Sequence, residues 1–457
     1  MTRDAAIAAA EADFDSNAFR DRLARLVAIP STSQDPAHAP DVQRYLGEEI
    51  QPWLARLGFT STIYPNPVAG SGPILVGQRI EDASLPTILT YGHGDTVRGL
   101  EDQWEEGLNP WVLTPRGDLW YGRGTADNKG QHATVISALE LVLKTRGKLG
   151  FNVKILIEMS EERGSIGLRS FVKENAALLA ADALIGSDGP RVGPTTPTIT
   201  TGSRGAFRFD LVLRERPGGV HSGNWGGMTT DPAIVMAHAI ASIADRNGRI
   251  LVPGLLPPHG LPNSVRDVLA GLELQSEESS TINPNWGEPG LSAAEKIYGW
   301  TSFIVLAMLS GRPEAPVNAV APDARAVCQL RYTVDCDPTT FEATIRKHLD
   351  DAGFPEIAIE NCGTGGFGAS RTDPGNVWVQ RVKASMERTL GKKVQIVPNG
   401  GGGLPGDMFV EFVGVPLVWI PLSYNGCRQH GPNEHFLAPA AREGLIGYTG
   451  LWWDLGE

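Results

Sequence analysis

Cysteine is scarce in this sequence, and its few copies are not arranged as metal ligands. The chain has 457 residues but only four cysteines, and no two of them form a C-x-x-C pair. This pattern is typical of reduced thiols in a cytoplasmic protein and argues against a thiolate zinc site. Any metal site in this chain would therefore use histidine and carboxylate ligands.

The sequence also lacks a surplus of positive charge and a long apolar run. Its 40 Lys and Arg residues are outnumbered by 52 Asp and Glu residues, which gives a formal net charge of −12. Nucleic acids and anionic membranes select basic surfaces, so neither is expected as a partner. No run approaches the roughly 18 apolar residues of a membrane-spanning helix. The first residues include Glu11 and Asp13 instead of the apolar core of a signal peptide, so we expect a short amphipathic helix and a cytoplasmic protein.

The first two hundred residues alternate apolar strands with amphipathic helices. Continuous apolar strands are predicted at residues 87–91, 152–159 and 183–187, and a helix is predicted at residues 129–144. Apolar strands separated by helices are typical of an α/β fold, in which a mostly parallel sheet has helices on both faces. The same pattern resumes near residue 374.

Between these two parts, the pattern changes to that of an inserted unit. The segment 206–213 alternates apolar and polar residues, as an antiparallel strand with one exposed face does. The elements that follow predict the order strand–helix–strand–strand–helix–strand, a ferredoxin-like α+β unit, with an irregular stretch at residues 251–299. A chain of this length favours two domains. We therefore expect one domain from residues 1–203 and 373–457, and an inserted domain from residues 204–372.

Polar segments follow several of the predicted strands, and an open α/β sheet collects its ligand-binding residues on that rim. A helix cap would explain Asp127 alone, and a solvated pair would explain Glu161 and Glu162. Taken together, however, the segments place imidazole and carboxylate groups at one rim, and zinc and similar cations take these ligands. The candidate metal ligands are His93, Asp127, Glu162, Asp188 and His430.

A centre with two metal ions gives each of these residues a role. Asp127 would bridge two ions, which lie about 3.5–4 Å apart in such sites. His93 and Asp188 would complete the ligands of one ion. Glu162 and His430 would complete those of the other.

Two neighbouring carboxylates would support the chemistry. Asp95 is placed to hold the second ring nitrogen of His93. Glu161 is expected to point away from Glu162 on an extended backbone. This orientation would leave Glu161 free to act as the general base for a metal-bridging water.

Four of these segments resemble the motifs of one known family. They read Gly-His-x-Asp at residues 92–95, Gly-Arg-Gly-x-x-Asp-x-Lys-Gly at 122–130, Glu-Glu-x-Gly-Ser at 161–165 and His-x-x-Asn-Glu at 430–434. In this order they resemble the di-zinc metallopeptidases that include carnosinase, aminoacylase, acetylornithine deacetylase and glutamate carboxypeptidase. The resemblance implies two divalent metal ions, with zinc as the expected metal and cobalt or manganese as alternatives.

The resemblance also assigns functions to the inserted unit. In the family this lid unit forms the dimer and sends a histidine into the partner's active site, and His221 matches that histidine. Asn318 and Arg331 match the asparagine of the lid and the arginine that holds the substrate carboxylate. The glycine-rich segment that contains Gly402 and Gly403 would let the backbone approach the substrate. Carnosinase-type members have a serine in this segment that is absent here.

Within the family, the resemblance is closest to the carnosinase-type dipeptidases. Asp188 supports this, because dipeptidases and aminopeptidases of the family tend to have aspartate there, whereas deacylases tend to have glutamate. The sequence therefore predicts a homodimeric, metal-dependent hydrolase that cleaves the amide bond of a dipeptide or a related small amide. Two alternatives stay open: an N-acyl amino acid deacylase or carboxypeptidase, and a non-catalytic metal-binding interaction protein.

Overall fold

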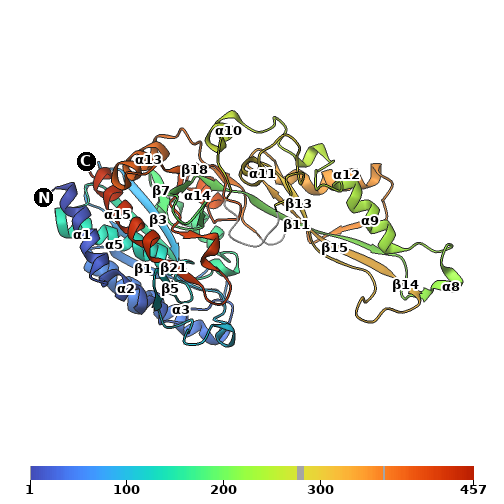
Figure 1. The fold of residues 1–457 in the computed structure, drawn as a ribbon, viewed down its shortest axis with the longest axis horizontal. Coiled ribbons are helices and arrows are strands. Elements are labelled where there is room, and N and C mark those ends of the chain that lie inside the picture. Colours follow the sequence, from blue (N-terminus) through green and yellow to red (C-terminus); the bar gives the residue numbers. More distant parts are fainter. Residues whose placement is uncertain (1, 275–281, 364–365) are drawn as a thin grey trace.

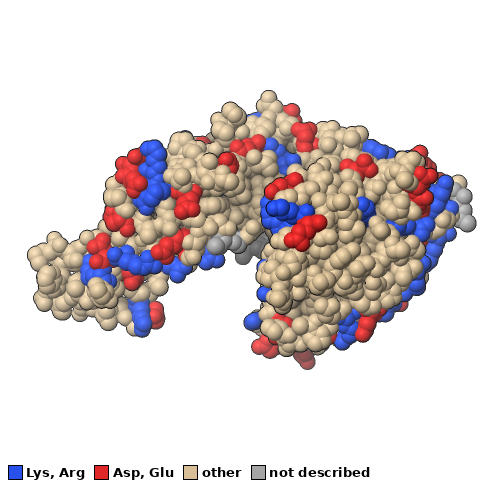
Figure 2. Space-filling model, turned by 180° about the vertical axis from the view of Figure 1, so that it is seen from behind, with Lys and Arg blue, Asp and Glu red and all other residues tan. Residues whose placement is uncertain are grey.

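The computed structural model describes residues 2–274, 282–363 and 366–457. Figure 1 shows a larger body, which contains both termini, and a narrower body that extends away from it. Seen from behind (Figure 2), the molecule is hollowed between the two bodies, and acidic and basic residues lie close to one another on the drawn face. Among the described helices, none is both long enough and apolar enough to cross a lipid bilayer.

The larger body is built on an eight-stranded sheet. Its central strands β6, β3, β7 and β19 run parallel to one another, while β1 and β2 are antiparallel at one edge. This confirms the predicted mostly parallel α/β sheet. In spatial order, the strands are β1 (Thr60–Tyr64), β2 (Ile74–Arg79), β6 (Asn152–Glu158), β3 (Thr87–His93), β7 (Ala183–Gly186), β19 (Leu417–Trp419), β9 (Thr198–Thr200) and β18 (Gln395–Val397).

Apolar residues bury both faces of this sheet. Within β6, Ile155 and Ile157 belong to one hydrophobic core, whereas Leu156 between them belongs to another on the opposite face. Successive strand residues point to opposite faces, so a continuous apolar run requires helices on both sides. One face carries α1 (Arg3–Asp15), α2 (Ala18–Val27), α5 (Lys129–Arg146), α13 (Val377–Leu390) and α15 (Ala438–Leu455), and the other carries α6 (Leu168–Glu174) and α14 (Asp407–Phe412).

Smaller elements complete the larger body. Residues 39–56 form α3 (Ala39–Arg44), a π-helical turn (Tyr45–Ile50) and α4 (Gln51–Arg56) in succession. The smaller elements also include a three-stranded sheet, a two-stranded sheet and a short helix. They are β4 (Thr114–Arg116), β5 (Leu119–Tyr121), β21 (His435–Leu437), α7 (Ala176–Leu179), β8 (Pro190–Arg191) and β20 (Ser423–Tyr424).

The narrower body is a four-stranded antiparallel sheet with two helices. The strands lie in the order β13 (Ser302–Leu309), β15 (Asp323–Tyr332), β11 (Gly205–Arg214) and β16 (Ala358–Glu360). The helices α9 (Pro232–Ile243) and α12 (Phe341–Asp351) share a separate hydrophobic core with this sheet. Chain order and strand order together give the predicted ferredoxin-like unit. At its far end lie β12 (Val220–His221), α8 (Ser222–Trp225) and β14 (Ala319–Val320) (Figure 1).

Among its described residues, the stretch 251–299, predicted to be irregular, contains a 3₁₀ turn (Pro253–Leu255) and two short α-helices. The helices are α10 (Asn263–Leu269) and α11 (Ala293–Tyr298), and they lie where the two bodies meet (Figure 1). The prediction was wrong here, because Ser292 and Glu295 have the spacing of a capping box and form one at the start of α11. Residues 275–281 of this stretch lie outside the described residues.

The chain crosses between the two bodies at one short strand pair. Strands β10 (Gly202–Ser203) and β17 (Ser370–Arg371) are antiparallel neighbours. They lie beside the domain limits predicted at residues 203/204 and 372/373. Those limits stay a prediction.

Candidate metal centre

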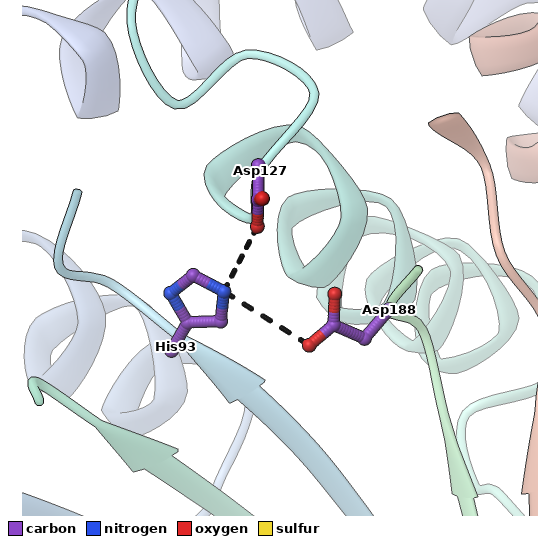
Figure 3. Close-up of side chains that lie close together, drawn as sticks. All are labelled: His93, Asp127 and Asp188. Carbon is purple, nitrogen blue, oxygen red and sulfur yellow. Dashed lines mark hydrogen bonds and ion pairs between the residues drawn. The ribbon is translucent and has the colours of Figure 1, made fainter. Parts of the chain in front are cut away.

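The ends of two adjacent strands bring His93 and Asp188 together with Asp127. His93 is the buried last residue of β3, and Asp188 follows β7, which is parallel to β3. The ring nitrogen Nε2 of His93 lies 3.1 Å from Oδ1 of Asp127 and 3.9 Å from Oδ2 of Asp188 (Figure 3). Asp127 lies in the turn just before α5.

The second carboxylate oxygen of Asp127 meets another histidine. Its Oδ2 lies 3.2 Å from Nε2 of His430, which also lies 3.0 Å from Oε2 of Glu162. Two trios of potential ligand atoms result, each within 4.8 Å of one another: His93, Asp127 and Asp188, and Asp127, Glu162 and His430. The structure thus brings all five predicted ligands together, with Asp127 shared. Their role as metal ligands stays a prediction.

The cluster holds more acidic groups than its two imidazoles can balance. Burial and the carboxylate of Asp127 raise the pKa of Glu162 to about 7, and they raise that of Asp188 to about 6. Burial also raises the pKa of Glu161 well above its usual range. Hydrogen bonds to Asp127 and Glu162 raise the pKa of His430 to about 11. Although burial opposes it, hydrogen bonds to Asp127 and Asp95 raise the pKa of His93 well above its usual range, so both imidazoles offset the carboxylates.

This donor set fits divalent metal ions. Two imidazole nitrogens and several carboxylate oxygens suit zinc, cobalt or manganese, and a cation would offset the mutual repulsion of the buried carboxylates. A metal would replace protons at these groups, because ligands bind in their deprotonated form. A bound metal would therefore lower the raised pKa values of these carboxylates.

Asp95 contacts His93 and the glutamate pair through both its backbone and its carboxylate. The Nδ1 atom of His93 lies 3.1 Å from the backbone oxygen of Asp95, closer than the 3.5 Å to its carboxylate. The carboxylate also accepts hydrogen bonds from the backbone N–H groups of Glu161 (3.1 Å) and Glu162 (3.2 Å). Asp95 therefore positions the histidine and the glutamate pair at once.

The expectation that Glu161 and Glu162 lie on an extended backbone was wrong. They begin a 3₁₀ turn (Glu161–Arg163), because the carboxylate of Asp95 binds both of their N–H groups. Both side chains consequently face the cluster. Oε2 of Glu161 lies 3.9 Å from Nε2 of His93, but Glu161 belongs to neither trio of potential ligands.

Glu434 was given no role from the sequence, although it closes the His-x-x-Asn-Glu motif. Its side chain is 1% exposed and accepts a hydrogen bond of 2.7 Å from Arg123, which is equally buried. It also accepts from the backbone N–H groups of Gly124, Ala126 and Asp127 at 3.0–3.1 Å. Glu434 therefore holds the turn that carries Asp127. The signal available in the sequence was a charged pair, Arg123 and Glu434, in two motifs that share one site.

Asn128 is a second residue without a predicted role. Its Oδ1 accepts a long hydrogen bond of 3.4 Å from the backbone N–H of His93, and its Nδ2 donates to the backbone oxygen of Ser187 at 2.8 Å. Asn128 thus joins the ends of the two strands that carry His93 and Asp188.

The predicted residues of the inserted unit lie away from this cluster. His221 ends β12 and Asn318 precedes β14, and these paired strands lie at the far end of the narrower body (Figure 1). Both residues are exposed, and the Ser222 N–H donates to the Asn318 backbone oxygen. Arg331 lies on β15, paired in register with Ala206, and its Nε donates to the side chain of Gln329. The structure does not bring these three residues to the metal cluster of the same chain.

A cavity of about 590 Å³ opens beside the cluster. It extends from Asp127 and Glu161 to the glycine-rich loop and to α11, and both Gly402 and Gly403 line it. Their contact with a substrate stays a prediction. An added Cβ at Gly402 would meet no atom within 4 Å, so the loop leaves this part of the cavity wide. The geometry offers a small-molecule site in which a bound ligand would contact the candidate metal ligands.

Comparison with known proteins identifies relatives over nearly the whole chain. The chain is 30% identical to the Cys-Gly metallodipeptidase DUG1 of Candida albicans, over 91% of this chain and 90% of that protein. It is 28% identical to the cysteinylglycine-S-conjugate dipeptidase of Corynebacterium striatum, over 87% of each chain. The crystal structure of human carnosine dipeptidase 1 has the same fold, with a TM-score of 0.78 and 22% identity, over 100% of this chain and 99% of that one.

The model of one protein family covers most of the chain. Residues 89–453 match the peptidase family M20/M25/M40. The matched region contains all four motifs and the inserted unit, so it confirms the resemblance and the prediction of a peptidase-type hydrolase. This chain belongs to peptidase family M20/M25/M40.

Proposed function

We propose that this chain is a metal-dependent dipeptidase that uses two divalent metal ions, with zinc as the native metal. The observation that carries the proposal is that two ligand trios share Asp127. Glu161 lies beside this cluster and belongs to neither trio. His93 and Asp188 would hold one ion with Asp127, and Glu162 and His430 would hold the other. The names of the relatives, which are dipeptidases acting on Cys-Gly and its conjugates, support a dipeptide substrate.

Glu161 is proposed as the general base and acid. Bound divalent ions supply two things in such sites: they lower the pKa of a water molecule and polarise the carbonyl that it attacks. The Glu161 carboxylate lines the cavity, and burial raises its pKa, so it can take a proton from water and return it to the leaving amine. Asp95 fixes the backbone of Glu161 and thereby aims this group at the cavity.

The proposal includes a homodimer in which the partner subunit's His221 completes each active site. His221 is exposed, and β12 pairs with β14 at the far end of the narrower body (Figure 1). A catalytic role of His221 would therefore be on another copy of the chain. The edge strand β13 exposes Val305, Leu306, Met308 and Leu309, between 37% and 60% each. An apolar edge strand is a ready surface for pairing with a second chain. The inserted unit, residues 204–372, would then be the lid and dimerisation domain.

Arg331 is proposed to hold the carboxylate of the substrate. Burial lowers the pKa of its guanidinium, and no carboxylate in the described part of the chain offsets that shift. A partly buried arginine of this kind can bind a planar carboxylate with two hydrogen bonds. Asn318 would act beside the partner subunit's His221, since the two residues are neighbours in this chain.

The proposed setting is the cytoplasm. The four cysteines form no disulfide, which supports a reducing environment, and no nucleic acid or membrane partner is proposed.

Hydrolysis of a mixed substrate panel tests the proposed function. The purified protein would be loaded with zinc or treated with a chelator, then offered free dipeptides and N-acyl amino acids. We expect cleavage of free dipeptides that depends on metal. Cleavage confined to N-acyl amino acids would assign the chain to the deacylases instead, and no cleavage of either class by protein with two bound metals would contradict an enzymatic function.

A further inference from the structure

The cavity beside the metal cluster has two chemically different halves. Four charged side chains line it, and all four belong to the cluster: Asp127, Glu161, Asp188 and His430. Toward α11, the described lining has no charged side chain. Ile297 and Tyr298 of α11 line it there, and the other large apolar side chains of the lining are Val192, Leu274, Ile282, Val397 and Leu404.

Two of these apolar side chains are exposed to solvent at the cavity. Ile282 is 53% exposed and Ile297 is 38% exposed, whereas Val192 and Leu404 are buried. A ligand that covered both isoleucines would remove apolar surface from water, which is favourable and needs no partner of opposite charge. A charged group would lose water there, and the described lining toward α11 offers no side chain of opposite charge in return.

Side-chain contacts from two sides hold in place the wall of the cavity formed by Ile297 and Tyr298. The side chain of Asn399, at the start of the glycine-rich loop, donates to the backbone oxygen of Tyr298 at 2.6 Å. Glu295 caps the start of α11 and pairs with Arg266 of α10 at 2.8 Å. The wall that carries Ile297 and Tyr298 is thus tied both to the loop that lines the cavity and to the neighbouring helix.

We propose that this half of the cavity is a specificity pocket for a large apolar side chain on one residue of the dipeptide. The proposal rests on the proposed dipeptidase function and deepens it by naming the substrate class. Glycines 400–403 line the cavity between the cluster and α11 and contribute no side chain. One residue of the substrate can therefore lie across this loop with its side chain against Ile297 while the scissile amide stays at Glu161.

Steady-state hydrolysis by the metal-loaded protein tests this pocket. The substrates would be Gly-Gly, Leu-Gly, Gly-Leu, Lys-Gly and Gly-Lys, which place an apolar or a charged side chain at each position. We expect leucine at one of the two positions to raise kcat/KM about tenfold or more over glycine, as filling an apolar pocket does. Lysine at the same position should give no such gain.

Two variants identify the pocket within the chain. Ile297→Ser and Ile282→Ser should each lower kcat/KM for the preferred leucine dipeptide about tenfold. The value for Gly-Gly should stay within about twofold, since glycine places nothing in the pocket. Ile80→Ser is the matched control, because Ile80 is an isoleucine 51% exposed that does not line the cavity. It should change neither value.

The outcomes separate this proposal from the function on which it rests. Cleavage of dipeptides without a preference for leucine at either position would overturn the pocket and leave the dipeptidase intact. An equal loss for Gly-Gly and the leucine dipeptide in Ile297→Ser would also overturn it, because Ile297 would then act in closure of the site. No cleavage of any dipeptide would instead contradict the proposed function itself.

Discussion

The carboxylate of Glu434 accepts a hydrogen bond of 3.1 Å from the backbone N–H of Asp127, across 307 positions of the chain. The same carboxylate is paired with buried Arg123. A segment near the C-terminus therefore fixes the residue that we propose to lie between the two metal ions. Removing the charge of Glu434 should loosen the turn and leave Arg123 buried without its partner.

We predict that Glu434→Gln destabilises the protein and weakens metal binding. Breaking a buried ion pair by removing one partner typically costs about 3–5 kcal/mol. Loss of a group that positions a metal ligand typically lowers metal affinity about 10- to 100-fold. Urea unfolding and zinc titration of the purified variant would measure both effects. Glu411→Gln is the control, since Glu411 forms an exposed ion pair with Arg169, and such pairs contribute about 0–1 kcal/mol.

Glu161→Gln should separate proton transfer from metal binding. Glutamine keeps the size of the side chain but cannot accept the proton, so we expect kcat/KM to fall about 10²- to 10⁴-fold. The metal content, measured by elemental analysis, should stay at the wild-type value because Glu161 belongs to neither ligand trio. Glu174→Gln, at an exposed position on α6, should leave both quantities unchanged. Wild-type hydrolysis by Glu161→Gln would eliminate Glu161 as the base.

Mixing two inactive variants tests whether His221 acts on the partner subunit. His221→Ala and Glu161→Gln should each be inactive as pure proteins. Exchange of subunits in an equal mixture should restore activity to about a quarter of wild type, because half of the dimers are mixed and each mixed dimer has one complete site. A mixture that stays inactive, in spite of subunit exchange seen by native mass spectrometry, would refute the shared site.

Arg331→Met should weaken binding only of substrates with a free carboxylate. A hydrogen-bonded ion pair of this kind contributes about 1.5–3 kcal/mol, so KM for a dipeptide should rise roughly tenfold or more. KM for the corresponding dipeptide amide should change little. Arg208→Met, at an exposed position on the adjacent strand β11, should affect neither substrate. An equal rise of KM for both substrates would assign Arg331 a structural role.

The strand ends were predictable from the sequence, because short apolar runs interrupted by polar residues mark the carboxyl rim of a parallel sheet. His93 and Asp188 come together because β3 and β7 are parallel neighbours. The local backbone at Glu161 was not predictable from the strand pattern. It depends on a side chain, Asp95, that folds back from the end of another strand and binds two N–H groups.

The long-range contacts around the cluster were not predictable from the sequence either. Asn128 and Glu434 act through backbone groups of segments far from them in the chain, and no local pattern reveals such partners. The helix α11 is a different case, since Ser292 and Glu295 have the spacing of a capping box. That signal was present in a region whose many Pro and Gly residues indicated an irregular loop.

A zinc titration of metal-free protein, followed by dipeptide hydrolysis at each step, tests the central claim most directly. If Asp127 joins two metal sites into one active centre, activity should rise until two equivalents of zinc are bound per chain and should be absent after chelation. Full activity with one equivalent, or hydrolysis that survives removal of all metal, would contradict the account.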